Sequence, residues 1–255
     1  MKNSIIAEKT LRGGGSSRLK PFPTKAFTLA EILVTLGIIG LVAALTLPVL
    51  TEKTKAKEFE TQFKVAENLI HNAVNYMHAN GREIYGETYC TANSSGIPSV
   101  VDCTNLEIFS EVLAEAFNGI RALNKYDSNW STTGHKYKTY SNSGEFKASL
   151  LDDGYMELIN GMSIMIESGS TSTLPIISID INGPYKKPNR FGYDTFSFVI
   201  DKGDRVCPLG SPACKSSSYS KNPENYCSKT SKADNNGFTC GYFASTDKNY
   251  FKNLK

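Results

Sequence analysis

The chain has few of the residues on which enzyme active sites most often depend. Histidine occurs three times and tryptophan once in 255 residues. His71 and His78 are seven residues apart, which is not the four-residue spacing of paired metal ligands on a helix, and His135 lies in a polar turn. The sequence contains no Gly-x-Ser-x-Gly elbow, no phosphate-binding loop and no zincin motif. We therefore expect that the protein is not an enzyme.

The chain also lacks a basic excess once its first residues are set aside. Residues 1–26 contain six basic side chains and one acidic side chain, a net charge of +5, whereas the whole chain carries only +3. The remaining residues therefore carry about −2, and no run of Lys and Arg with interleaved aromatic residues occurs among them. The charge pattern thus predicts no nucleic-acid partner.

One long hydrophobic run is present. Ile32–Leu50 contains 19 residues without a charge, and as a helix it would be about 30 Å long, enough to cross the hydrocarbon core of a bilayer. Glu31 precedes the run, and a carboxylate inside a membrane helix costs roughly 2.5–3.5 kcal/mol on insertion scales. We therefore expect Glu31 to need a partner that the backbone of its own segment does not supply.

The basic residues before this run predict that its N-terminal end stays in the cytoplasm and that the remainder of the chain is exported. An ordinary secretory signal has a shorter apolar stretch with its cleavage site after it. Here the junction between polar and apolar residues lies before the run. Cleavage at this junction would leave the apolar helix in the mature protein.

The residues around this junction, Lys25-Ala26-Phe27-Thr28-Leu29-Ala30-Glu31, and the apolar run after them resemble the N terminus of type IV pilins and type II secretion pseudopilins. The resemblance is specific over residues 1–50 and only architectural beyond them. It implies that a prepilin peptidase cuts between Ala26, where the family usually has glycine, and Phe27, whose new amine is then methylated. It also implies that Glu31 neutralises the terminal amine of a neighbouring subunit's Phe27.

The resemblance further implies that Pro48 marks where the helix melts on assembly. From its chemistry alone, Pro48 predicts a kink or a local opening of the helix. The implied partners are homologous pilin subunits, a prepilin peptidase/methyltransferase and an inner-membrane assembly platform. The implied location is the cytoplasmic membrane, crossed once with the head exported, and then a periplasmic or cell-surface filament. A minor pilin acting as tip adhesin or uptake receptor is the alternative, and a membrane-anchored enzyme is disfavoured by the missing catalytic motifs.

Cysteine usage agrees with export. All six cysteines lie beyond the apolar run, at Cys90, Cys103, Cys207, Cys214, Cys227 and Cys240. An even number of cysteines is typical of an oxidising compartment. Pairing in sequence order would close three short loops, each of which contributes about 2–3 kcal/mol in the chain-entropy treatment. A zinc site is the alternative, although no C-x-x-C pair is present.

Hydrophobic periodicity predicts an α+β fold of the pilin type, in which a long N-terminal helix packs on an antiparallel sheet. We expect a leader over residues 1–26, a membrane or filament-core helix over 27–50, and an amphipathic continuation of the same helix over 51–80. Its apolar stripe would consist of Phe59, Phe63, Ala66, Ile70, Ala73, Val74 and Met77.

The globular head is expected over residues 81–206. A second helix is predicted from Asn105 to about Lys125, with Asn118-Gly119 as an alternative, earlier end. Strands are predicted at Ser163–Glu167, Pro175–Ile181 and Thr195–Asp201, and either a strand or a short helix at Phe146–Leu151. Residues 207–255 would form a loop region held mainly by its cysteines, because few apolar residues are available to hold it.

One segment inside the predicted sheet offers a candidate metal site. Residues Asp180–Asp194 are similar to an Asp-x-Asn-Gly … Pro-Asn-x-x-Gly-x-Asp-x-Phe pattern of pilin-like sequences. Asp180, Asn182 and Asp194 are hard oxygen ligands of the kind that calcium prefers. The alternative is that these residues build consecutive turns through bonds from side chain to backbone. Three basic residues in the segment and a spacing unlike that of an EF-hand favour the turns. No other cofactor is expected.

Overall fold

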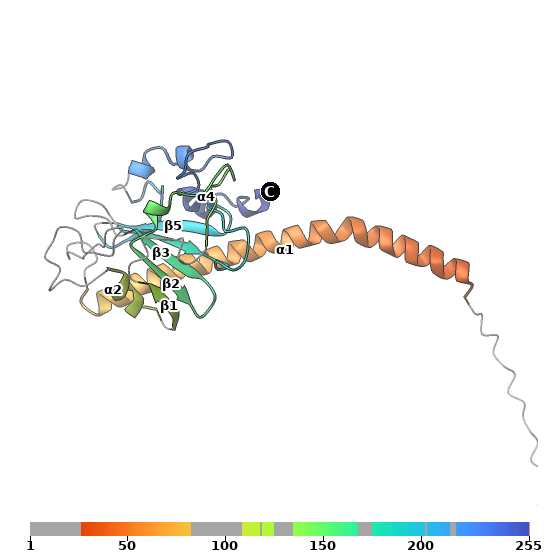
Figure 1. The fold of residues 1–255 in the computed structure, drawn as a ribbon, viewed down its shortest axis with the longest axis horizontal. Coiled ribbons are helices and arrows are strands. Elements are labelled where there is room, and N and C mark those ends of the chain that lie inside the picture. The colour runs from red at the N-terminus through yellow and green to blue at the C-terminus, as the bar shows by residue number, and fades with distance from the viewer. Residues whose placement is uncertain are drawn as a thin grey trace, which may run out of the picture. The chain divides into compact units, whose positions relative to one another are not determined.

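The structure is a computed structural model that describes residues 27–82, 109–117, 119–124, 135–167, 175–201, 203–214 and 218–254. It has the expected α+β class, with a long apolar helix near the N terminus and a six-stranded antiparallel open sheet (Figure 1). Contacts along the chain divide it into two units, Met1–Val49 and Leu50–Lys255.

Helix α1 extends from Leu29 to Ala79, within two residues of the predicted bounds. It continues through Pro48, so this proline does not interrupt the helix. The helix ends in a Schellman motif, in which Arg82 N donates to Met77 O and Gly81 N donates to His78 O. Gly81 adopts the left-handed φ of +75° that this motif requires. The sequence signal Asn80-Gly81 therefore marks the end of the helix correctly.

The second half of α1 packs on the sheet through the predicted apolar stripe. Phe63, Ala66, Ile70, Ala73, Val74 and Met77 are all buried, and Phe59 is partly buried against the same core. The ring of Phe63 lies 4.8 Å from that of Phe196 and 5.7 Å from that of Phe251, measured between centroids. Burial of this stripe is the main attachment of α1 to the head, since each fully buried side chain of this size contributes about 1.5–3 kcal/mol.

The sheet is a meander in which every strand pairs with the next one in the chain. The strands are β1 (Ile120–Asn124), β2 (Gly154–Leu158), β3 (Ser163–Glu167), β4 (Ile176–Asp180), β5 (Thr195–Ile200) and β6 (Val206–Pro208). Strands β3, β4 and β5 were predicted, with ends correct to within one residue. Short 3₁₀ helices lie at Ala148–Leu150, Ser218–Ser220, Pro223–Tyr226 and Phe251–Asn253.

Of the two ends predicted for the second helix, the one at Asn118-Gly119 is close to the structure and the one near Lys125 is wrong. Helix α2 covers Phe109–Glu115 within the described residues, which begin at Phe109 in this part of the chain, and the chain then enters β1, which pairs with β2. Gly119 separates the two elements with a φ of +79°, a backbone conformation that a helix does not use. A short apolar run has no periodicity long enough to distinguish a helix from a strand.

The C-terminal region is not a loop held mainly by its cysteines. Strand β6 extends the sheet, helix α4 covers Cys240–Thr246, and Phe238, Tyr250 and Phe251 are buried. Successive residues of a strand point to opposite faces of the sheet, and both faces of this sheet are covered. The face with Ile177 and Ile179 shares a core with α1, whereas Phe238 belongs to a second core that contains Val199 of the opposite face.

Candidate functional site

The start of α1 holds the first candidate site, which consists of Thr28 and Glu31. Glu31 Oε2 accepts hydrogen bonds from Thr28 N at 2.8 Å and from Thr28 Oγ1 at 2.9 Å. Glu31 N donates to Thr28 Oγ1 at 3.2 Å in return. This reciprocal arrangement is a capping box, which satisfies backbone donors at the start of a helix.

The capping box corrects the expectation that the segment's own backbone leaves Glu31 without a partner. The carboxylate is held by the backbone N–H and the hydroxyl of a residue three positions earlier. The signal was present in the sequence, because Thr-x-x-Glu immediately before an apolar run is the signature of a capping box. Thr28 is therefore the residue of this candidate site that sequence reasoning missed.

The segment that follows Glu31 has the properties of a membrane-crossing helix. Within the described residues, α1 is near the N terminus and is long and apolar enough to span a bilayer. Its large apolar side chains are exposed, and Phe27 itself is 81% exposed. The hydroxyls of Thr35 and Thr46 donate to the carbonyl oxygens of Ile32 and Val42 in the same helix. These internal bonds meet the requirement that polar groups in lipid find partners within the protein.

Small residues leave open surface along this segment. A Cβ added at Gly37 or Gly40 would meet no atom within 4 Å. Glycine at such positions permits the backbone of a second helix to come close. Ala26, on the other side of the expected cleavage site, lies outside the described residues.

The connection between β4 and β5 holds the second candidate site. Asp180 is fully buried, and its Oδ1 accepts hydrogen bonds from Asn182 N at 3.2 Å and Gly183 N at 2.9 Å. Its Oδ2 accepts one from the hydroxyl of Tyr137 at 2.7 Å. Asp180 thus closes a tight turn and joins it to a distant segment of the chain.

Asp194 closes the other end of the connection in the same manner. Its Oδ2 accepts a hydrogen bond from Asn189 N at 2.8 Å, and its Oδ1 accepts one from Arg190 N at 2.6 Å. Burial raises the pKa of Asp194, and burial together with the nearby charge of Asp194 raises the pKa of Asp180. All four carboxylate oxygens therefore already face N–H or O–H donors, as the turn interpretation requires.

The asparagine side chains of this connection differ from the two aspartates. Asn182 Oδ1 and Asn189 Oδ1 are buried and accept no hydrogen bond from the described part of the chain. Asn189 also has a positive φ of +49° and donates through Nδ2 to Pro184 O. Two glycines of this connection have positive φ as well, +84° at Gly183 and +78° at Gly192.

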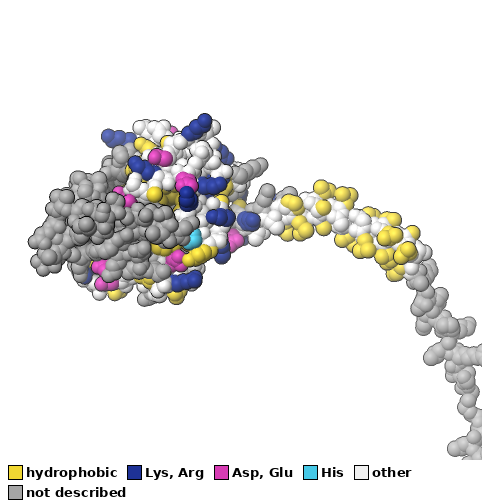
Figure 2. All heavy atoms as spheres, viewed as in Figure 1, with side chains coloured by type: hydrophobic (Ala, Val, Ile, Leu, Met, Phe, Trp, Pro, Cys, Tyr) yellow, Lys and Arg dark blue, Asp and Glu magenta, His cyan; other side chains and the backbone are white. Residues whose placement is uncertain are grey.

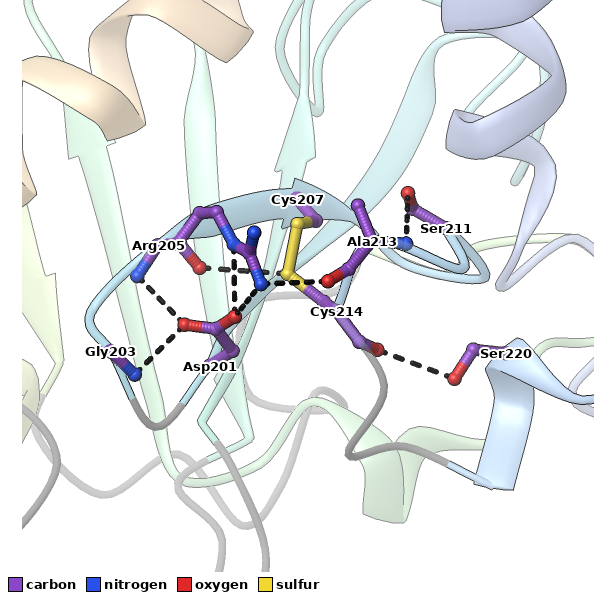
Figure 3. Close-up of polar contacts among 8 residues, drawn as sticks. All are labelled: Asp201, Gly203, Arg205, Cys207, Ser211, Ala213, Cys214 and Ser220. Atoms are coloured by element: carbon purple, nitrogen blue, oxygen red, sulfur yellow. Dashed lines mark hydrogen bonds and ion pairs between the residues drawn. A yellow bond between two sulfur atoms is a disulfide. The ribbon is translucent and has the colours of Figure 1, made fainter.

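Two of the three expected disulfides fall within the described residues, and both are present. Cys207 is bonded to Cys214 and Cys227 to Cys240, the pairings expected from the sequence. Figure 3 shows how the first disulfide is supported: Arg205 donates from Nε and Nη2 to Asp201 Oδ2, and from Nη2 to Ala213 O. Arg205 thus ties the turn after β5 to the disulfide loop. Cys90 and Cys103 lie outside the described residues.

The histidines form no catalytic arrangement within the described residues. His78 Nε2 lies 3.3 Å from Asp204 Oδ2, which joins the end of α1 to the turn after β5. The ring of His135 makes an edge contact with the ring of Tyr185, with 4.9 Å between the two ring centroids. The described ranges contain no group of three or more His, Cys, Asp or Glu side chains that would suit a metal ion.

Comparison with known proteins adds no relative. No family model matches the chain, and no curated protein or solved structure is significantly similar to it.

Proposed function

We propose that the chain is the precursor of a pilin-like structural subunit of a type IV pilus or a type II secretion filament. The observation that carries this proposal is the placement of Glu31 in a capping box at the start of a helix that continues with 19 uncharged residues. A helix attached to a sheet head with two disulfides suits an exported subunit that polymerises through the helix.

In the proposed mechanism, a prepilin peptidase cuts before Phe27 on the cytoplasmic side and the new amine is methylated. The subunit waits in the cytoplasmic membrane, with its head exported. When an assembly platform extracts it, the apolar helices of homologous subunits bundle and remove their exposed side chains from lipid. The head then forms the outer surface of the filament.

The geometry of Glu31 suits both stages of this mechanism. The two bonds from Thr28 end on Oε2, and Oε1 accepts no hydrogen bond from the described residues. Oε1 is therefore available for the terminal ammonium of a neighbouring Phe27 while the capping box stays closed. A charge pair of this kind offsets the cost of holding the carboxylate in apolar surroundings and fixes the axial register between subunits.

The adhesin or receptor alternative depends on the region 207–240 presenting a binding surface. Cys207, Cys214, Phe238 and Cys240 are buried, whereas residues 221–235 are exposed or half-buried. The region therefore has an exposed surface, and the adhesin or receptor stays the alternative to the structural subunit.

Two substitutions of Glu31 separate its two roles. Glu31→Gln keeps a side chain that closes a capping box but removes the charge, whereas Glu31→Ala removes both. We expect both variants to insert in the membrane and both to lose incorporation into sheared filaments. Thr28→Val, which removes the capping hydroxyl and keeps the charge, should retain more incorporation than either. Normal assembly by Glu31→Gln would contradict the charge-pair mechanism.

Processing is tested separately by intact mass spectrometry of the membrane-extracted protein. The expected chain begins at Phe27 and carries one methyl group. A stable chain that begins at Met1 in cells containing the peptidase would contradict the proposal.

A further inference from the structure

The first two turns of α1 after the apolar run carry three exposed lysines. Lys53, Lys55 and Lys57 follow Leu50 by three, five and seven residues, and all three side chains are exposed. At 1.5 Å per helical residue, Lys53 lies about 4.5 Å and Lys57 about 10.5 Å beyond Leu50 along the helix. The polar headgroup layer of a bilayer is about 5–8 Å thick on each side. Lys53 therefore falls within this layer, and the long side chain of Lys57 reaches it.

Two of these lysines border an open groove. The groove has a volume of about 580 Å³ and is lined by Lys53, Thr54, Lys57, Glu58, Thr61 and Gln62. The two lysines are one helical turn apart, so they lie on the same side of α1. The hydroxyls of Thr54 and Thr61 donate to the carbonyl oxygens of Leu50 and Lys57. Both hydroxyl protons are thus already used within the helix, and the ionic groups of the groove are the two ammonium groups and the carboxylate of Glu58, a net charge of +1.

Two acidic residues of the turn that follows have partners within α1. Glu60 pairs with Lys64 at 2.7 Å, and Glu58 accepts a hydrogen bond from Gln62 Nε2 at 3.3 Å. In contrast, Lys53, Lys55 and Lys57 form no ion pair with another described residue. Their charges therefore remain available to an external anion.

The C-terminal segment adds basic groups at the same end of the head. Phe251 lies against Phe63, at a centroid distance of 5.7 Å, which places the neighbouring Lys252 beside the start of the buried stripe. The pKa of Glu60 is lowered first by its hydrogen bond from Lys64 and also by the charges of Lys252 and Lys57. Figure 2 shows apolar side chains around the first part of α1 and Lys and Arg side chains on the surface of the second unit.

We propose that the groove at Lys53 and Lys57 binds the headgroups of anionic phospholipids while the subunit waits in the membrane. The inference rests on the proposed function, because it requires that α1 cross the bilayer. Charge complementarity and continuity with the apolar run both favour a lipid surface as the partner. A second copy of the chain is the competing occupant, and the test below separates the two.

The experiment uses the full chain reconstituted at low protein-to-lipid ratio in vesicles of phosphatidylcholine. Spin-labelled phosphatidylglycerol or spin-labelled phosphatidylcholine is added, and electron paramagnetic resonance gives the association of each lipid with the protein. We expect the anionic lipid to be preferred, and Lys53→Gln/Lys57→Gln to lower that preference about 5- to 25-fold. Each basic side chain near an anionic surface contributes about 1 kcal/mol, which is about fivefold.

Lys64→Gln is the matched control, because Lys64 lies on the same helix but is paired with Glu60 and is about 21 Å beyond Leu50. This variant should keep the preference for phosphatidylglycerol. In the unsubstituted chain, salt at about 0.5 M should weaken the preference, because it screens the charges of the lysines and the headgroups. An unsubstituted chain without any preference would overturn the inference.

Two further outcomes are informative. If Lys53→Gln/Lys57→Gln keeps the lipid preference but loses association between subunits, the groove serves a second copy and the lipid proposal is wrong. If the chain is not recovered in the bilayer fraction at all, the proposed function itself fails. The two failures are therefore distinguishable.

Discussion

Two glycines from different turns meet at one end of the sheet, and their substitution provides a sharp test of the fold. Gly161 lies in the turn between β2 and β3, and Gly183 lies in the connection between β4 and β5. Both have a positive φ, +89° and +84° respectively. A Cβ added at Gly183 would lie 2.0 Å from Gly161 O, whereas a Cβ added at Gly161 would meet nothing within 4 Å. The pair thus shares a backbone conformation and differs in the space around it.

The expected costs follow from this difference. Gly161→Ala should lower the free energy of unfolding by about 1–2 kcal/mol, the cost of a left-handed residue with a Cβ. Gly183→Ala should incur the same cost and a further 1–3 kcal/mol, roughly, because the atom that it meets is backbone and the two turns must separate. The totals are about 1–2 and about 2–5 kcal/mol. For a unit of this size, each kcal/mol changes the melting temperature by about 2–4 °C.

The measurement is thermal unfolding of the detergent-solubilised full chain, followed by circular dichroism. We expect Gly161→Ala to melt about 2–8 °C and Gly183→Ala about 4–20 °C below the unsubstituted chain. The double variant should show non-additive costs, because the two residues are in contact. Equal shifts for the two single variants would refute the close approach of the two turns.

Three further predictions follow from the same unit. Calcium added to the metal-stripped chain should leave the melting temperature unchanged, since the oxygens of Asp180 and Asp194 already face donors; a rise of several degrees that is lost in Asp180→Ala and Asp194→Ala would show a calcium site instead. Burial, and then the charges of Asp153 and Asp152, raise the pKa of Glu167 from 4.5 to about 8. Because this folded-state pKa lies above the unfolded one, the contribution of Glu167 to stability is lost as the pH rises through about 8. Glu167→Gln should therefore have a higher urea midpoint than the unsubstituted chain at pH 9 and a similar one at pH 5; an equal difference at both pH values would contradict this. Cys227→Ser/Cys240→Ser opens a loop with a sequence separation of 13 and should cost about 3 kcal/mol of stability in urea. Since Cys240 belongs to the core shared with α1, we expect one cooperative loss rather than a loosened tail, and unchanged melting of the sheet would contradict this.

Long periodic patterns made α1 predictable from the sequence. The apolar run and the stripe that begins at Phe59 extend over many helical turns. A periodic pattern of that length rarely arises by chance in a sequence that is not helical. The glycine after the last turn then fixed the end of the helix. Strands β3 to β5 were predictable because their β-branched and aromatic residues are enriched between clear turn signals.

The missed strands are short and have ordinary composition. Gly154–Leu158 contains a glycine and a glutamate, so its composition is not typical of a strand. The segment is a strand in the structure because it pairs with β3. Only glycine has room at position 154, because a Cβ added there would lie 2.6 Å from Ser110 Cβ of α2. Such a close approach between elements far apart in the sequence is a tertiary constraint that no local pattern contains. The C-terminal region was missed for a similar reason, since three aromatic residues spread through a polar sequence fill gaps in two different cores.

The two candidate sites also differ in whether a local motif or a tertiary contact defines them. The capping box at Thr28 and Glu31 is a local motif, and the spacing of these two residues was sufficient to predict it. The role of Asp180 depends on a bond from Tyr137, 43 residues earlier in the chain. Only the folded structure shows that this carboxylate joins two segments as well as closing its own turn.

The position of Phe251 has a consequence for the order in which the contacts of the fold form. Its ring contacts Phe63 and Phe196, and Tyr250 beside it donates a hydrogen bond to Gly192 O. Phe251 follows Phe63 by 188 residues (251 − 63), so α1 gains this aromatic contact only after two distant parts of the chain have come together. Contacts over such a long separation form late, because the entropy of loop closure must be lost before the contact stabilises the fold. A substitution at Phe251 would therefore loosen the packing of α1 as well as that of the short helix in which Phe251 lies.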